Sequence, residues 1–226
     1  MTALAIATGI SAVVALIYQF QYVGAEPSIG RSLVKTSAVL VLLAGLFLSV
    51  DVAPSTIDLP TISGSQFDPL FFVCAALVFS AIGDFCLSRD GWNATGAGII
   101  SFGMAQIAYI IALVVMIAGL PFPPDWVRYA LPTIAALGVV ILPRVIPLTV
   151  RVLMMIYAVL LLVMAWFGVI SGSQYLAIGA ILFVLSDLLI AVGMDPRLPG
   201  RMRRISDQAV WTIYWLAQAL LVWGFY

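Results

Sequence analysis

The chain has 226 residues, of which 64% are hydrophobic and 9% charged, and its mean hydropathy is +1.17. Soluble domains are about 45–50% apolar and about 25% charged, so this composition indicates an integral membrane protein. Ten Lys and Arg balance ten Asp and Glu, which excludes the broad basic surface that nucleic-acid binding needs. With no histidine and only two cysteines, the sequence also excludes a His/Cys zinc cluster and His-dependent nucleophilic catalysis, and we expect neither a metal nor a cofactor.

Apolar runs of about 20 residues predict membrane-spanning helices, because a helix of that length crosses the hydrocarbon core. Proline, glycine and polar clusters separate the runs and predict an all-α bundle of about eight helices, with residues 1–226 as a single transmembrane domain. In chain order the predicted spans are 2–20, 31–50, 69–88, 94–119, 126–143, 148–170, 174–194 and 207–226. The fifth span is the weakest of these, because Pro132 and Gly138 interrupt it.

The basic residues predict the orientation of the bundle. Nine of the ten follow odd-numbered spans, and only Arg128 follows an even-numbered one. The nine are Arg31, Lys35, Arg89, Arg144, Arg151, Arg197, Arg201, Arg203 and Arg204. The odd-numbered connections are therefore expected in the cytoplasm, with both termini outside. Compact size and short loops are typical of a bacterial inner-membrane protein, although an endoplasmic-reticulum protein shares these features.

Two pairs of spans carry similar motifs. The third ends in the run Phe79 to Asp84 and the seventh in Phe183 to Asp187, each with a small residue before the carboxylate. The fourth and eighth share an Ala-Gln pair, at Gln106 and Gln218. These matches predict two parallel four-helix halves, the alternative being coincidence among apolar helices.

Most charged residues lie in connections or at the ends of the predicted spans. The exceptions, which fall in the cytoplasmic halves of their spans, are Lys35, Asp84 and Asp187. A charge at this depth costs at least a few kcal/mol unless it faces the bundle interior or water, so such a residue by default marks a functional site. Two alternatives are structural. The carboxylates can be paired with Lys35 or capped by hydroxyl groups, and Lys35 can extend its charge to the interface.

Polar side chains on neighbouring spans are expected to reach the same layer and line a cavity. Alternatively, each serves helix packing, the aromatic belt or interhelical hydrogen bonding. The candidates are Ser80, Gln106, Tyr109, Tyr157, Ser186, Tyr214 and Gln218.

Two carboxylates in a cavity of low dielectric should not both stay ionised, because burial and mutual repulsion disfavour the second charge. One neutral acid beside one carboxylate forms an acid/base pair, and acid catalysis is the reaction class that these residues support best. A small proton-coupled transporter of an amphiphile needs the same residues and stays an alternative, as does a non-catalytic lipid-binding or membrane-assembly protein.

At these residues the sequence resembles the lysoplasmalogenase (YhhN-like) family of membrane proteins. The similar stretches are Phe79 to Leu87 with its Gly-Asp pair, Phe183 to Leu189 with its Ser-Asp pair, Tyr157, and Tyr214 to Leu220. The sequence departs from the family pattern at two positions. Lys35 is followed by Thr36 where the family often has proline, and Gln106 stands where many members have histidine.

The resemblance implies hydrolysis of the vinyl ether bond of lysoplasmalogens, lysophospholipids drawn from the bilayer. The products are a fatty aldehyde and a glycerophospho-ethanolamine or -choline. Asp84 and Asp187 are then the catalytic residues, with Asp187 favoured as the acid because it is expected to lie deeper. Lys35 is expected to attract the lipid phosphate. The tyrosines and Gln218 are expected to orient the water and the carboxylates, while the headgroup preference and the oligomeric state stay open.

Overall fold

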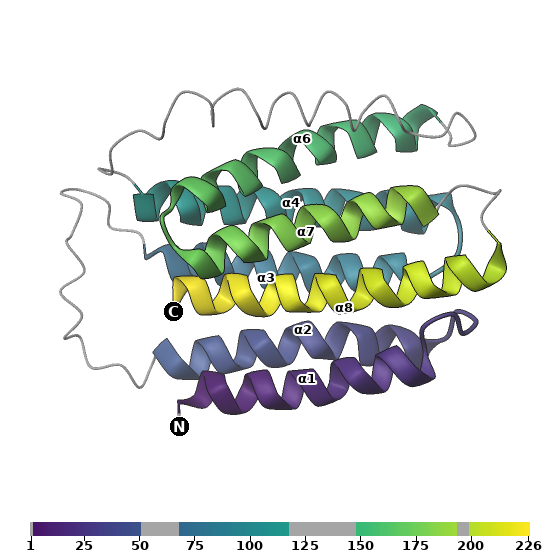
Figure 1. The fold of residues 1–226 in the computed structure, drawn as a ribbon, viewed down its shortest axis with the longest axis horizontal. Coiled ribbons are helices and arrows are strands. Elements are labelled where there is room, and N and C mark those ends of the chain that lie inside the picture. The colour runs from purple at the N-terminus through teal and green to yellow at the C-terminus, as the bar shows by residue number, and fades with distance from the viewer. Residues whose placement is uncertain (1, 51–67, 118–147, 194–198) are drawn as a thin grey trace.

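The computed structural model describes residues 2–50, 68–117, 148–193 and 199–226, which form seven helices and no strand (Figure 1). The helices are α1 (Ala3–Gln21), α2 (Ile29–Val50), α3 (Pro69–Leu87), α4 (Trp92–Ile117), α6 (Leu148–Ile170), α7 (Gln174–Gly193) and α8 (Gly200–Phe225). The expected all-α class is confirmed. The expected span 126–143 lies outside the described residues, so the count of eight and the two halves stay predictions.

The helix boundaries follow local signals in the sequence. At the start of α3, the Asp68 side chain accepts a hydrogen bond from the Leu70 backbone N–H, and Pro69 occupies the first helical turn. Six of the seven helices begin and end within two residues of the expected spans. The exception is α8, expected from residue 207 but beginning at Gly200. The arginines assigned to a connection are good helix formers and build its first turns directly after Pro199.

Six of the described helices are long and apolar enough to cross a membrane, namely α1, α2, α3, α4, α6 and α7. The chain is therefore a multi-pass membrane protein. Helix α8 is less apolar, because its first turns carry arginines and its inner face carries Trp211, Tyr214 and Gln218. These three side chains are buried, so this polar face of α8 points into the protein rather than toward lipid.

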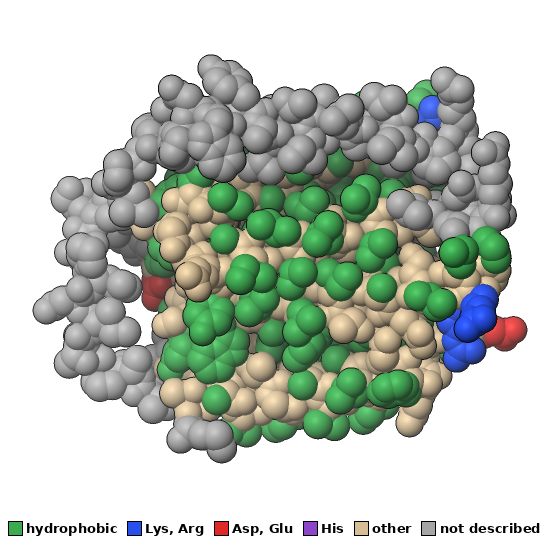
Figure 2. All heavy atoms as spheres, viewed as in Figure 1, with side chains coloured by type: hydrophobic (Ala, Val, Ile, Leu, Met, Phe, Trp, Pro, Cys, Tyr) green, Lys and Arg blue, Asp and Glu red, His purple; other side chains and the backbone are tan. Residues whose placement is uncertain are grey.

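The helices run side by side along the long axis of the molecule, and the two termini lie at the same end (Figure 1). Consecutive described helices pack on one another from α1 through to α8. Helix α8 also contacts α1, α2 and α3, which closes the arrangement into a ring. Hydrophobic side chains cover much of the visible face (Figure 2), as expected for a surface in contact with lipid tails.

Two glycines let helix pairs approach closely. A Cβ on Gly83 of α3 would lie 2.6 Å from the ring of Phe102 on α4. A Cβ on Gly179 of α7 would lie 3.0 Å from the backbone nitrogen of Leu221 on α8. Small residues at such contacts are how membrane helices gain close packing. The glycine beside Asp84 therefore lets α3 lie close against α4.

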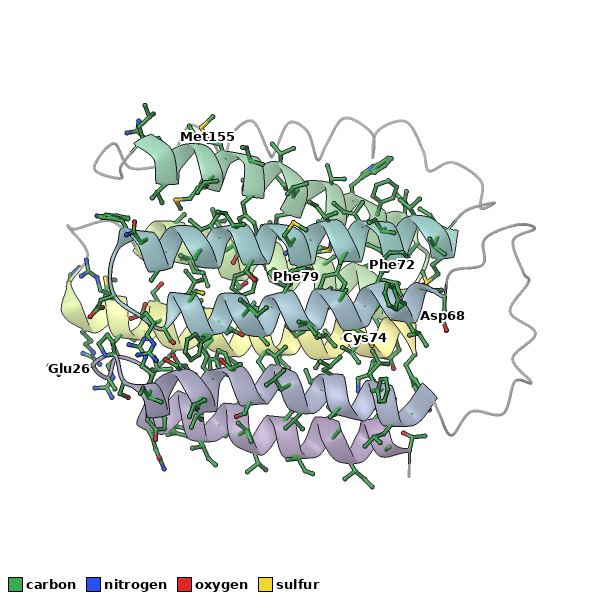
Figure 3. The ribbon with its side chains drawn as sticks, turned by 180° about the vertical axis from the view of Figure 1, so that it is seen from behind. Glu26, Asp68, Phe72, Cys74, Phe79 and Met155 are labelled. Carbon is green, nitrogen blue, oxygen red and sulfur yellow. The ribbon has the colours of Figure 1, made fainter. Side chains whose placement is uncertain are left out.

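Charged groups gather at one end of the bundle. Figure 2 shows Lys and Arg side chains at the end opposite the termini. Figure 3, the view from behind, places Glu26 at that end and Asp68 at the other. Arg31 lies in the first turn of α2 and Arg201 in the first turn of α8, at this same end. The basic groups are thus collected as the positive-inside rule requires, while the side of the membrane that they face stays a prediction.

Candidate active site

A cavity of about 660 Å³ lies among the helices, and every described helix contributes to its wall. Both candidate carboxylates line it, Asp84 from α3 and Asp187 from α7. The polar lining also includes Lys35, Tyr157 and Tyr214, whereas most of the remaining wall is apolar. A largely apolar cavity with a few convergent polar groups is the usual form of a small-molecule site.

The carboxylate of Asp84 is buried, with 1% of its side chain exposed, and both of its oxygens have partners. The Lys35 Nζ lies 2.9 Å from Oδ1, and the Tyr214 hydroxyl donates to Oδ2 over 2.8 Å. The Lys35 ammonium also lies 5.8 Å from the ring centroid of Trp211. Both partners of this buried carboxylate, the ammonium and the hydroxyl donor, favour its ionised form.

A hydrogen-bond chain extends this ion pair toward α4. The Gln218 Nε2 donates to the Tyr214 hydroxyl oxygen over 3.2 Å and to the Ser80 Oγ over 3.0 Å. The Tyr109 hydroxyl donates to the Gln218 Oε1 over 2.6 Å. Because the Gln218 amide donates to Tyr214, the phenol proton of Tyr214 is directed at Asp84. Six predicted site residues from four helices thus form one network.

The second carboxylate, Asp187, has different surroundings. It is half-buried, and its Oδ2 accepts a short hydrogen bond from the Tyr157 hydroxyl of α6. Within the described ranges it forms no ion pair. Ser186, predicted beside it as a site residue, donates instead to the Phe183 carbonyl of its own helix over 2.7 Å. Asp187 is more exposed than Asp84, while its expected greater depth in the membrane stays a prediction.

Gln106 differs from Gln218, its expected counterpart. Its side chain is fully buried, yet neither amide atom has a hydrogen-bond partner among the described residues. The amide lies near the Tyr157 hydroxyl. A buried amide without partners is costly, and native proteins usually satisfy such groups with protein atoms or ordered water. The two glutamines therefore differ in role: Gln218 completes a hydrogen-bond network, whereas the Gln106 amide lies near the Tyr157 hydroxyl with its donors and acceptor unpaired among the described residues.

Several residues that line the cavity, Arg31 among them, were not among the predicted site residues. Arg31 and Trp211 both line the cavity. Arg31 precedes Lys35 by four residues, and this spacing places both on one helix face, so the signal was present in the sequence. Trp211 precedes Tyr214 by three residues on the inner stripe of α8, and its indole N–H donates to the Ala15 carbonyl over 3.0 Å. The tryptophan thereby ties α8 to α1 beside the ion pair.

The fold and the cavity together define a polytopic helical membrane protein with a polar site enclosed between its helices. The family model of the YhhN family matches residues 30–225, a range that contains every predicted site residue. The chain belongs to the YhhN family, the family of the lysoplasmalogenases, and the resemblance seen in the sequence is confirmed. No curated protein and no solved structure matches the chain.

Proposed function

We propose that this protein is a lysoplasmalogenase-type hydrolase, which cleaves the vinyl ether bond of a lysoplasmalogen by acid catalysis. The observation that carries the proposal is the difference between two carboxylates on one cavity. Asp84 is paired with Lys35, whereas Asp187 accepts a hydrogen bond from the Tyr157 hydroxyl and forms no ion pair among the described residues. Two carboxyl groups with unlike surroundings can divide the roles of acid and stabilising anion. Membership of the YhhN family supports the same reaction.

Asp187 is the general acid in this mechanism. The Tyr157 hydroxyl occupies its Oδ2, which leaves Oδ1 to carry a proton into the cavity. A vinyl ether is hydrolysed by protonation of its β-carbon, the alkenyl carbon that is not bonded to the ether oxygen. This protonation makes an oxocarbenium ion. Asp187 supplies that proton and becomes a carboxylate. A neutral acid at this place costs less than a second buried charge would.

Asp84 is the anion that faces the developing cation. Its charge is fixed before the reaction by Lys35 and Tyr214, so no reorganisation is needed when the oxocarbenium ion forms. Water then adds to the alkenyl carbon that is bonded to the ether oxygen and gives a proton to Asp187, which restores the acid. The hemiacetal collapses to a fatty aldehyde and a glycerophospho-alcohol, so vinyl ether and water are converted without any further reactant.

The apolar part of the cavity suits the alkenyl chain. Met154, Ala158 and Leu161 of α6 face Val184 and Leu188 of α7 along its wall. Such a wall stabilises a bound hydrocarbon by about 0.8 kcal/mol per buried methylene relative to water. The chain of a lysolipid would lie there, with its vinyl ether beside the two carboxylates.

The test is aldehyde release from purified, folded protein in detergent, with a lysoplasmalogen as substrate. Asp187→Asn and Asp84→Asn should each lose activity by at least about a hundredfold, in the range usual for removing a general acid or an electrostatic stabiliser. Ser37→Ala is a matched control, because the Ser37 hydroxyl bonds only to the Val34 carbonyl of its own helix and does not line the cavity. Wild-type activity in both Asp variants would refute the mechanism.

A proton-coupled carrier of an amphiphile remains the second candidate, because the same two carboxylates on one cavity can bind and release protons. The assays separate the two functions. A hydrolase releases aldehyde in detergent, whereas a carrier moves its substrate only across sealed vesicles under a proton gradient. Uptake without aldehyde would favour the carrier.

A further inference from the structure

Lys35, the cation expected to attract the lipid phosphate, is already paired with a carboxylate. Lys35 was predicted to attract the phosphate, but its ammonium lies 2.9 Å from the Asp84 carboxylate and close to the Trp211 ring. A phosphate at Lys35 would compete with Asp84 for the same ammonium. It would also be taken out of water beside a carboxylate, and like charges repel strongly where the dielectric is low. A different cation is therefore needed.

Arg31 has the properties that Lys35 lacks. It lies one helical turn before Lys35 on the same face of α2, and its side chain lines the cavity. Its Nη1 donates to the Ala25 carbonyl over 2.8 Å, and its Nε donates to the Tyr18 hydroxyl over 3.4 Å. Among the described residues it forms no ion pair. A guanidinium has five N–H donors, so these contacts orient it and still leave donors for a ligand.

The surroundings of Arg31 add positive charge and space. A second cavity of about 450 Å³ shares Val23, Gly24 and Asp207 with the central cavity. Arg203 and Arg204 of α8 line this second cavity. The mouth where the two cavities meet thus carries three guanidinium groups and one carboxylate among its described lining residues. This balance of charge favours an anion.

We propose that Arg31 binds the phosphate group of the lysophospholipid at the mouth of the central cavity. Arg31 and Lys35 are four residues apart, which is about 6 Å along the helix axis. The glycerol backbone separates phosphate from vinyl ether by a comparable length. A phosphate at Arg31 therefore places the vinyl ether at the level of Lys35 and the carboxylates, with the alkenyl chain beyond them. The rest of the headgroup extends into the second cavity.

This assignment rests on the proposed hydrolase function and names its substrate class: an alkenyl lysolipid that carries a phosphate, in preference to an alkenylglycerol that carries none. The kinetic test compares 1-alkenyl-glycerophosphoethanolamine with 1-alkenylglycerol for Arg31→Gln, Arg31→Lys and the wild type. Arg31→Gln should raise KM for the phospholipid about tenfold or more, in line with the loss of a charge-assisted hydrogen bond. It should leave kcat and the KM for alkenylglycerol near their wild-type values. Arg31→Lys should fall between, because it keeps the charge and loses the planar fork.

Arg89→Gln is the matched control. It removes one positive charge from the same end of the bundle, but Arg89 lies against the Phe85 ring, 4.9 Å from its centroid, and lines neither cavity. This variant should keep wild-type KM for both substrates. An equal rise in KM for Arg89→Gln and Arg31→Gln would overturn the assignment, because general surface charge would then explain the effect.

A binding measurement separates failure of this inference from failure of the proposed reaction. A 1-alkyl lysophospholipid has a saturated ether that cannot be cleaved, so its effect on Tm reports binding alone. It should raise the Tm of the wild type but not that of Arg31→Gln, whereas 1-alkylglycerol should raise both. If the wild type releases no aldehyde, this comparison still tests Arg31. A phospholipid shift retained in Arg31→Gln, or both shifts lost, would refute a phosphate site at Arg31.

Discussion

The buried ion pair gives a prediction about stability that does not depend on the proposed reaction. Replacing Lys35 by methionine leaves the Asp84 carboxylate with the Tyr214 hydroxyl as its remaining partner, in a position that is 1% exposed. Breaking a buried pair by removing one partner costs about 3–5 kcal/mol, because the other charge stays buried without compensation. For a chain of this length, each kcal/mol lowers Tm by about 2–4 °C. Lys35→Met should therefore lower Tm by roughly 6–20 °C.

The double variant Lys35→Met/Asp84→Asn decides whether the charge is the cause. It removes both charges and keeps a group at position 84 that can accept the Tyr214 hydrogen bond. Replacement of a whole buried ion pair by neutral groups is often close to neutral. The double variant should recover most of the lost Tm while staying inactive in aldehyde release. Thermal unfolding in detergent, followed by tryptophan fluorescence, measures Tm, and the aldehyde assay measures activity. Additive losses in the two single variants and the double variant would refute the reasoning, because independent sites add and coupled sites do not.

Three further predictions concern single residues. Tyr157→Phe removes the hydroxyl that orients the proposed acid, and kcat for aldehyde release should fall about tenfold or more with little change in KM; an unchanged kcat would dissociate Tyr157 from the reaction. Gln106→Leu removes two buried amide atoms that have no partners among the described residues, so Tm should hold or rise by a few degrees while kcat falls. A lower Tm would contradict the conclusion that the Gln106 amide is unpaired. Gly83→Ala places a methyl group 2.6 Å from the Phe102 ring and should cost about 1–3 kcal/mol, whereas Gly96→Ala, where the nearest atom is 3.8 Å away, should leave Tm within error.

Much of the bundle was predictable because its signals are local. An apolar run between breakers reports its own helix, and Asp68 with Pro69 marks the start of α3 within a few residues of sequence. The start of α8 was predicted too late because its local signal, a cluster of arginines, has two meanings. Arginines mark a membrane boundary and so predict a connection, but they also propagate a helix, and α8 contains them from its first turn at Gly200 onward.

The site was harder to predict because its partners come from distant parts of the chain. Asp84 and Tyr214 are separated by 130 residues, and no local pattern links them. Gln106 and Gln218 have the same neighbour in sequence, yet only Gln218 meets partners on other helices. Periodicity identified which polar residues face inward, but which of them touch depends on how α8 closes against α1, α2 and α3.

Because α8 is the last helix of the ring to be synthesised, the site is completed only late in translation. Synthesis runs from the N-terminus, so Lys35 and Asp84 enter the membrane well before Tyr214 and Gln218. Until α8 inserts, the carboxylate lacks its phenol donor, and the gap between α7 and the first three helices is open to lipid. The hydrogen-bond network around Asp84 is therefore incomplete through most of translation. Truncation before α8 should produce a bundle with exposed charge, which quality-control proteases recognise and degrade.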